Sequence, residues 1–158
     1  ITIPNDDFFQ SRGEKWSAAQ NMVHLIISLK TTVAAYSLPK FLVRLIRGKP
    51  NRASRSYEEL VEKYRAKLAA GGKAQGRYVP KKIHPSHTRE QVLNKWLKIT
   101  EDYLEAIRKN WATEQFDEYI VKHPLLGKIT LRELCYFTIY HTRHHFEIIK
   151  SRSPGFAN

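Results

Sequence analysis

The sequence repeats one helix-start signal four times. In this signal, the capping box, a Ser or Thr stands before the helix and a Glu or Gln follows three residues later. Each of the two side chains then bonds a backbone N–H that the first helical turn leaves free. The four pairs are Ser17–Gln20, Ser56–Glu59, Thr88–Gln91 and Thr130–Glu133. A chain with these start points is constrained to four main helical segments.

Helix-stop signals follow three of the four segments. Glycine and proline favour helix ends, and they occur at Gly48 and Pro50, at Gly71 and Gly72, and at Pro154 and Gly155. The start and stop signals together predict helices over residues 17–47, 57–70, 88–112 and 130–151. Pro39 predicts a kink or a break within the first of these, because it lacks an N–H and clashes with the preceding turn.

No segment alternates apolar and polar residues as a strand would, and residues 71–87 form a long basic connection between the second and third helices. The chain has 158 residues, of which 42% are hydrophobic, and this is typical of one globular domain. We therefore expect residues 1–158 to form a single all-α domain, a four-helix bundle with a long crossover.

A single cysteine, Cys135, excludes an internal disulfide and a cysteine-rich zinc site, and we expect it to be a small core residue. The start of the chain, ITIPNDDFF, has no basic region ahead of an apolar run, as a secretory signal would have. The most apolar segment, residues 22–46, is interrupted by a histidine, two lysines and an arginine and is too polar to span a membrane. The sequence therefore predicts a cytoplasmic protein.

The net charge of +12 is concentrated in residues 40–82, which hold thirteen Lys or Arg against three Glu and so carry +10. Such a block attracts anions, membrane surfaces or nucleic acids. Aromatic residues do not interleave with these basic residues, however, as a platform for stacking bases requires. We therefore interpret residues 40–82 as a solvated basic surface and expect neither nucleic-acid nor membrane binding.

Three of the seven histidines lie within five residues, in the segment HTRHH at 141–145. His141 and His145 are four residues apart, which places them one turn apart on the same helix face. Burial of two imidazoles costs free energy unless hydrogen bonds or a metal compensate, and imidazole binds zinc, nickel, copper and iron. Both histidines belong to a stripe with the spacing of a core seam, which consists of Leu134, Thr138, His141, His145 and Ile148.

A metal site that leaves a position open for substrate usually has three protein ligands. His24 is the best candidate for the third, because apolar residues surround it and it too should face inward. Asn21, Ser28 and Thr31 form a narrow polar stripe with His24, as residues that line a cavity in a bundle do. Two alternatives stay open: an HxxxH pair occurs by chance on many helices, and an isolated His24 is more often a hydrogen-bonded core residue.

The other four histidines have different expected roles. We expect His84 and His87, in the basic connection, to be solvated, and His123, which precedes a proline, to cap or pack its loop. His144 is expected on the helix surface or behind the metal ligands. Glu133 belongs to a capping box, and the sequence has no HExxH motif, no GxSxG motif and no glycine-rich phosphate loop. No catalytic residue can be assigned from the sequence.

Two segments resemble the DinB/YfiT-like family of metalloenzymes. They are KWSAAQNMVHLI and, after the crossover, HPLLGKITLRELCYFTIYHTRHHFEIIK. Members of this family carry one histidine in an early helix with a Trp-Ser start, here Trp16 and Ser17, and an HxxxH pair in the last helix. Position by position, the resemblance makes His24, His141 and His145 the metal ligands. It spans residues 15–150, and the HPxxGxxT approach to the last helix is similar to that of a bacterial subgroup.

The resemblance implies a four-helix bundle with a long crossover, often dimeric, that holds a divalent metal near one end of its core. Zinc or nickel is expected first, and manganese or iron next. Some members are transferases or isomerases that use a low-molecular-weight thiol. One departure is that the family has a helix before the one with the first histidine, whereas only fifteen residues precede Trp16. That helix is expected upstream of Ile1, or residues 57–70 take part of its role.

The sequence thus predicts a metal-dependent enzyme, a thiol-dependent transferase or a hydrolase, that acts on a small molecule and forms a homodimer. Its metal would lower the pKa of a bound water or stabilise a substrate thiolate. The alternative is a non-catalytic metal-binding or interaction module, against which a defined pocket beside the metal would argue. A third, less favoured hypothesis is a binder of nucleic acid or of an anionic surface. The residues expected around the ligands are Asn21, Ser28, Thr31, Thr138 and His144.

Overall fold

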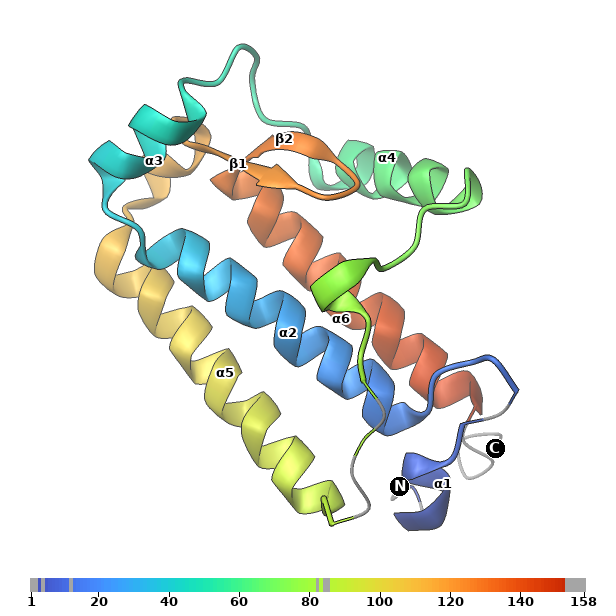
Figure 1. The fold of residues 1–158 in the computed structure, drawn as a ribbon. Coiled ribbons are helices and arrows are strands. Elements are labelled where there is room, and N and C mark those ends of the chain that lie inside the picture. Colours follow the sequence, from blue (N-terminus) through green and yellow to red (C-terminus); the bar gives the residue numbers. More distant parts are fainter. Residues whose placement is uncertain (1–2, 4, 12, 82, 84–85, 153–158) are drawn as a thin grey trace.

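The computed structural model describes residues 3, 5–11, 13–81, 83 and 86–152 (Figure 1). His84 and the stop signal after residue 152 lie outside the described residues. Apart from one short hairpin the elements are helical, and the predicted all-α class is confirmed. In chain order they are α1 (Asn5–Phe9), α2 (Ala18–Ser37), α3 (Lys40–Arg47), α4 (Tyr57–Ala69), the 3-10 turn η1 (Gly76–Tyr78), α5 (Arg89–Asn110), the 3-10 turn η2 (Thr113–Asp117), β1 (Ile120–His123), β2 (Gly127–Thr130) and α6 (Leu131–Arg152).

Each of the four predicted capping boxes is formed. Ser17, Ser56 and Thr88 accept the N–H three residues later, and the Gln or Glu at that position accepts the N–H of the cap. Before α6, Thr130 N–H donates to Glu133 at 2.9 Å, and Glu133 N–H donates to the Thr130 hydroxyl at 3.2 Å. The long helices therefore start within one residue of the predicted positions.

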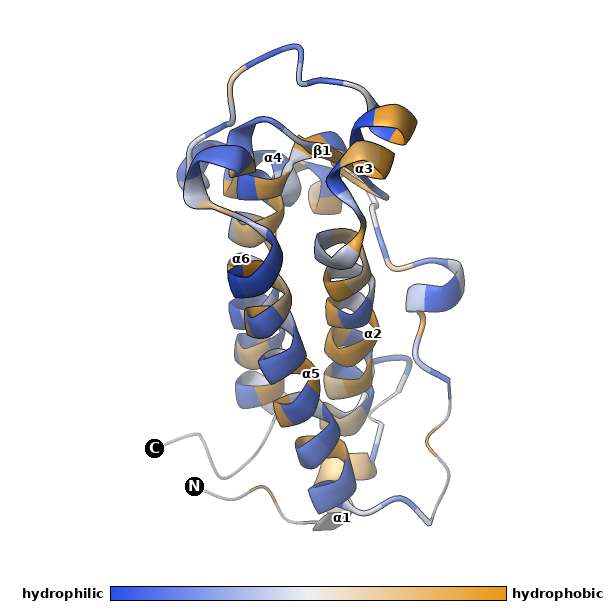
Figure 2. Ribbon diagram, turned by 90° about the vertical axis from the view of Figure 1, so that its left-hand side faces the viewer, coloured by the Kyte–Doolittle hydropathy of each residue, from blue (hydrophilic) through white to orange (hydrophobic). Residues whose placement is uncertain are grey.

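The predicted break at Pro39 separates α2 from α3. Leu38 ends α2 with an extended backbone, because the proline ring disfavours a helical conformation in the residue before it. α3 is largely apolar in Figure 2, and its Phe41 and Leu45 side chains are 69% and 79% exposed. No helix in the described part of the chain is long and apolar enough to cross a membrane.

The prediction that the chain contains no strand is wrong just before α6. β1 and β2 pair antiparallel with His123 opposite Gly127, so that three residues form the loop between them. Gly127 has a φ of +76°, a conformation that glycine adopts at little cost and that three-residue hairpin loops require. Each strand has only four residues, which is too short for alternation to be recognised in the sequence.

The long helices surround the space in which the histidines lie. α2 packs against α5 and against α6, and α4 packs across the first half of α6 (Figure 1). The crossover after α4 contacts α2 through η1 and then reaches the start of α5 at the other end of the molecule. The backbone of this connection thereby forms part of one wall of that space.

Two apolar clusters hold the helices in this arrangement. One is centred on Tyr36, whose hydroxyl donates to the Leu131 carbonyl at 2.7 Å and whose carbonyl accepts from Trp111 Nε1 at 2.6 Å. Cys135 packs against this cluster, as expected for a small core residue, with its Sγ 2.9 Å from the Tyr36 hydroxyl. The other cluster joins α1, α2 and α5 through Phe8, Ala19, Ile26, Leu29, Val92 and Ile99.

Glu133 does more than complete its capping box. Its side chain is 0% exposed and accepts from the guanidinium groups of Arg52 and Arg55 at 2.8 and 2.9 Å, and from the Arg55 backbone N–H at 3.0 Å. This carboxylate therefore ties the segment before α4 to the first turn of α6, the helix that carries two of the three histidines.

Candidate metal centre

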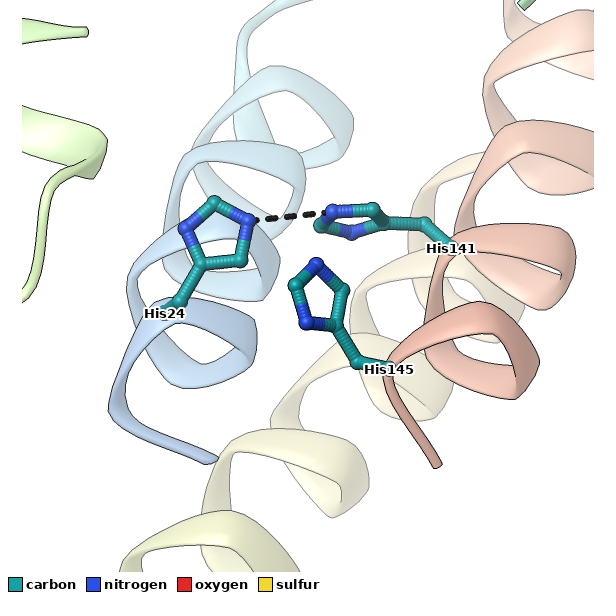
Figure 3. Close-up of side chains that lie close together, drawn as sticks. All are labelled: His24, His141 and His145. Atoms are coloured by element: carbon teal, nitrogen blue, oxygen red, sulfur yellow. Dashed lines mark hydrogen bonds between the residues drawn. The ribbon is translucent and has the colours of Figure 1, made fainter. Parts of the chain in front are cut away.

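Three histidines meet between α2 and α6 (Figure 3). His24 comes from α2, His141 and His145 come from α6, and all three side chains are buried. Each offers a ring nitrogen, and these nitrogens all lie within 4.8 Å of one another. Nε2 of His24 and Nε2 of His141 are 3.0 Å apart. The fold thus brings together the three histidines that the sequence selected.

The position of each histidine follows from where its helix starts. The capping box at Ser17 begins α2, and His24 lies two turns later on its buried face. The capping box at Thr130 begins α6, and His141 and His145 follow on one face, one turn apart. Because local caps fix both helix starts, the position of each histidine along its helix does not depend on the long connections between the helices.

The protonation of His24 is set by the crossover. Its Nδ1 lies 2.7 Å from the backbone carbonyl oxygen of Tyr78 in η1. A carbonyl can only accept a hydrogen bond, so the neutral ring carries its proton on Nδ1. Nε2 is then left with a lone pair directed at the other two histidines. A hydrogen bond of this kind orients metal-binding histidines and fixes their tautomer.

Asn21 sets the protonation of His145 in the same way. The Asn21 amide nitrogen donates to the Ser17 carbonyl at 2.8 Å and to the Trp16 carbonyl at 3.3 Å, so the amide oxygen points away from them. That oxygen lies 2.7 Å from Nδ1 of His145 and accepts its proton. Nε2 of His145 is thereby left unprotonated, as a metal ligand must be.

Burial keeps the imidazoles of His24 and His141 neutral. It lowers the pKa of His24 below its usual value, although the hydrogen bond to Tyr78 acts in the opposite direction. Burial also lowers the pKa of His141 well below the usual value, and the positive charge that His145 and His24 could carry lowers it further. Both rings are neutral near pH 7 without any carboxylate beside them, and neutral imidazole is the form that binds metals.

The donor set fits a divalent transition metal. An imidazole nitrogen binds such an ion at about 2.0–2.1 Å, so two nitrogens on one ion stand about 2.8–3.4 Å apart at bond angles of about 90–109°. The 3.0 Å between the Nε2 atoms of His24 and His141 falls within this range. Three protein ligands would leave at least one coordination position for water or substrate.

A cavity of about 800 Å³ adjoins the three histidines. The three histidines form part of its wall, and so do Trp16 and Tyr64. The opposite wall comes from the crossover and from the β1–β2 hairpin, so segments far apart in the sequence enclose one space. A cavity of this size is typical of sites that bind small molecules.

A sequence model of the DinB superfamily matches residues 3–149 of the chain. The protein belongs to the DinB superfamily. Comparison with curated proteins and with solved structures gives no match. The DinB match includes all of α2 and the part of α6 that carries His141 and His145, and it confirms the family that the sequence motifs indicated.

In this DinB-superfamily protein, the residues expected around the ligands have different locations. Asn21, Ser28, Thr31 and His144 line the cavity, and Asn21 also holds His145. Thr138 is not among the lining residues, and its hydroxyl donates to the Leu134 carbonyl at 2.9 Å, within α6. His144 is half-buried and stacks on Tyr140.

Three further residues have contacts that bear on their predicted roles. His87 is half-buried rather than solvated. His123 caps its loop as predicted, since its Nδ1 accepts the N–H groups of Leu125 and Leu126, yet it also lines the cavity. Tyr78 was not predicted as a site residue. It acts through a backbone carbonyl, which every residue type carries, so no sequence signal could have found it.

Proposed function

We propose that this DinB-superfamily protein is a metal-dependent enzyme in which His24, His141 and His145 hold one divalent transition-metal ion. The observation that carries the proposal is the convergence of three buried imidazoles at the wall of a cavity. Two of these rings are held through Nδ1 by protein acceptors, the Tyr78 carbonyl and the Asn21 amide oxygen, so the Nε2 atom of each ring keeps a lone pair with which it can bind a metal.

Imidazole donors favour zinc or nickel over the ions that prefer oxygen ligands, with manganese and iron as the next candidates. Three neutral ligands also leave the charge of a divalent ion uncompensated. The site would therefore attract an anion, such as a thiolate or hydroxide. When bound, the ion would act as a Lewis acid and lower the pKa of a coordinated thiol or water.

The protein side of the reaction consists of binding, orientation and exclusion of water. Apolar side chains, among them Leu134 and Phe137, enclose the cavity near the histidines and restrict the access of bulk water. Ser28 and Thr31 are polar residues of the same lining, and the Thr31 hydroxyl donates to the Ile27 carbonyl at 3.1 Å within α2. We propose a small-molecule substrate and a thiol-dependent transferase reaction, which the likeness to the family favours, with hydrolysis as the second reaction class.

A non-catalytic metal-binding module is the alternative, and the cavity speaks against it. A site that only stores a metal or stabilises a fold has all its coordination positions filled by protein. Here the described residues offer three ligands, and a cavity of about 800 Å³ adjoins them. An open position beside a cavity of that size favours an enzyme over a storage or interaction module.

The test is elemental analysis of untagged protein purified without chelator or added metal. We expect about one transition-metal ion per chain, and its loss in each of the variants His24→Ala, His141→Ala and His145→Ala. His144→Ala is the matched control, because His144 lies beside His145 on α6 and lines the same cavity. The proposal fails if His141→Ala retains the full metal content, or if the unaltered protein binds no ion after reconstitution with zinc, nickel, manganese and iron.

A further inference from the structure

His123 ends β1 and is held there through one of its two ring nitrogens. Nδ1 accepts hydrogen bonds from the backbone N–H groups of Leu125 and Leu126, at 3.2 and 3.1 Å. Both partners are donors, so Nδ1 must present a lone pair and carries no proton. A neutral imidazole whose Nδ1 is unprotonated carries its proton on Nε2. The hairpin turn thus selects the tautomer of His123, and it selects the one opposite to that of His24.

The neutral state of His123 is secured by its surroundings. The ring packs edge-on against Phe137 of α6, with ring centroids 4.2 Å apart. Burial lowers the pKa of His123 to about 4, so the ring stays neutral at physiological pH. His123 is therefore a rigid side chain with one N–H group whose direction is fixed by the turn on one side and by an aromatic ring on the other.

That N–H group is not sealed from solvent. Nε2 makes no hydrogen bond to any described residue, and it is not among the polar atoms of this part of the chain that are sealed from solvent without a partner. His123 lines the same cavity as the three proposed metal ligands. A fixed donor without an acceptor among the described residues, on a side chain that lines a ligand-sized space, is placed to bind an acceptor atom of the molecule that enters.

The charges around the cavity indicate what kind of acceptor this is. Lys15, Lys73 and Lys122 come from three separate segments and all line the cavity. Glu14 is the one carboxylate among the described lining residues. Lys122 is also the sequence neighbour of His123. Three cations against one anion favour a negatively charged molecule, and carboxylate oxygen is a strong acceptor for an imidazole N–H.

We propose that His123 is a substrate-positioning residue, whose Nε2–H donates a hydrogen bond to a carboxylate of the substrate. The proposal rests on the proposed function to the extent that the cavity is the substrate site. According to this proposal, the substrate is a small anion that binds through two different groups. One group of the substrate reaches the metal position, and its carboxylate is held by His123 with the lysines nearby.

Two variants separate the role of His123 in the turn from its role toward substrate. In His123→Asn, the amide oxygen stands near the position of Nδ1 and can accept the two turn N–H groups, but nothing replaces Nε2. In His123→Gln, the amide nitrogen reaches the position of Nε2, but the acceptor at Nδ1 is lost. The first variant keeps the turn and loses the cavity donor, and the second does the reverse.

The first measurement is the histidine tautomer by ¹⁵N NMR on metal-free protein. We expect the pattern of a neutral ring protonated at Nε2 for His123, with no change between pH 6 and pH 8. A ring protonated at Nδ1 would overturn the proposal, because Nδ1–H could not accept the turn N–H groups and Nε2 could not donate. This readout does not depend on whether the protein binds a metal or has activity.

The second measurement is calorimetric titration of the zinc-loaded protein with 3-mercaptopropionate and with propane-1-thiol, which lacks the carboxylate. We expect the unaltered protein to prefer 3-mercaptopropionate by about tenfold or more, as a hydrogen bond to a charged group provides. His123→Asn should lose most of this preference and keep its thermal midpoint, whereas His123→Gln should keep the preference and melt lower.

Each outcome has a distinct meaning. Absence of the preference in the unaltered protein, or an undiminished preference in His123→Asn, overturns the role of His123. If only His123→Gln loses the preference, the residue acts through the turn alone and the proposal is wrong. If the metal site is wrong, elemental analysis will find no zinc in the protein. The tautomer of His123, which is measured on metal-free protein, will still test the role of His123.

Discussion

The amide oxygen of Asn21 on α2 lies 2.7 Å from Nδ1 of His145 on α6, and this contact joins the two helices that carry the three histidines of the candidate metal centre. Asn21 is itself held by the carbonyls of Ser17 and Trp16, which lie at the start of α2. The cap of one helix therefore orients a proposed ligand on another. The binding properties of the site should depend on this residue, although it offers no atom to the metal.

Replacement of Asn21 by alanine should weaken metal binding by about 10–100-fold, the usual effect of removing a hydrogen-bond partner of a metal-binding histidine. Competition with a chromophoric chelator measures the affinity. Asn21→Asp retains an acceptor for Nδ1 but loses the N–H₂ group that donates to the Ser17 and Trp16 carbonyls, so it should recover only part of the loss. Ser28→Ala is the control, since Ser28 lines the same cavity from the same helix. Equal affinities of Asn21→Ala and Ser28→Ala would contradict the assigned role.

Glu133→Gln should destabilise the protein by about 2–4 kcal/mol, because it removes the charge that pairs with Arg52 and Arg55 and leaves buried donors poorly satisfied. Chemical denaturation at pH 7 measures the difference. Glu118→Gln is the control. Glu118 pairs with Arg44 at 3.4 Å but its side chain is 56% exposed, so its loss should cost at most about 1 kcal/mol. Similar losses in the two variants would show that the burial of Glu133 contributes nothing.

The stabilisation by Glu133 should also depend on pH. Burial acts to raise the pKa of Glu133, but hydrogen bonds from Arg52 and from the backbone of Thr130 and Arg55 outweigh it, and the pKa is lowered. A carboxyl group with a lowered folded pKa contributes stability that is present above its unfolded pKa of about 4.3 and lost as the pH falls through the folded value.

The difference in unfolding free energy between the unaltered protein and Glu133→Gln should therefore be constant from about pH 7 to pH 5 and shrink at lower pH. Denaturation curves at a series of pH values down to about 3 give this difference directly. A difference that stays constant over the whole range would mean that Glu133 is not ionised in the folded protein.

The helices and the three histidines could be predicted because their signals are local. A capping box spans four residues and an HxxxH pair spans five, so each can be read from one short stretch. The residues that hold the histidines through hydrogen bonds could not be predicted in the same way. His24 is held by a carbonyl fifty-four residues away in the sequence, and a backbone atom leaves no mark on the residue type.

His123 illustrates a second limit. Its position before a proline correctly predicted that it caps a loop, but an imidazole has two nitrogens, and the cap uses only one. Whether the other nitrogen faces solvent, protein or a cavity depends on how the hairpin packs against α6 at Phe137. That packing involves strands of four residues, which the sequence did not reveal.

The contact between His24 and the Tyr78 carbonyl can be tested through Gly76, which starts η1 with a φ of +55°. Gly76→Ala has free space for its methyl group but strains the backbone by about 1 kcal/mol, and displacement of η1 should weaken metal binding by at most about fivefold. Gly71→Ala is the matched control. Gly71 has a φ of +86° and equal space for a methyl group, but it lies at the end of α4, away from Tyr78.

Both variants should lose similar stability, measured by denaturation, and only Gly76→Ala should lose metal affinity in the chelator competition. A loss of affinity in Gly71→Ala as well would mean that the whole crossover, rather than the hydrogen bond at Tyr78, determines how firmly His24 is held.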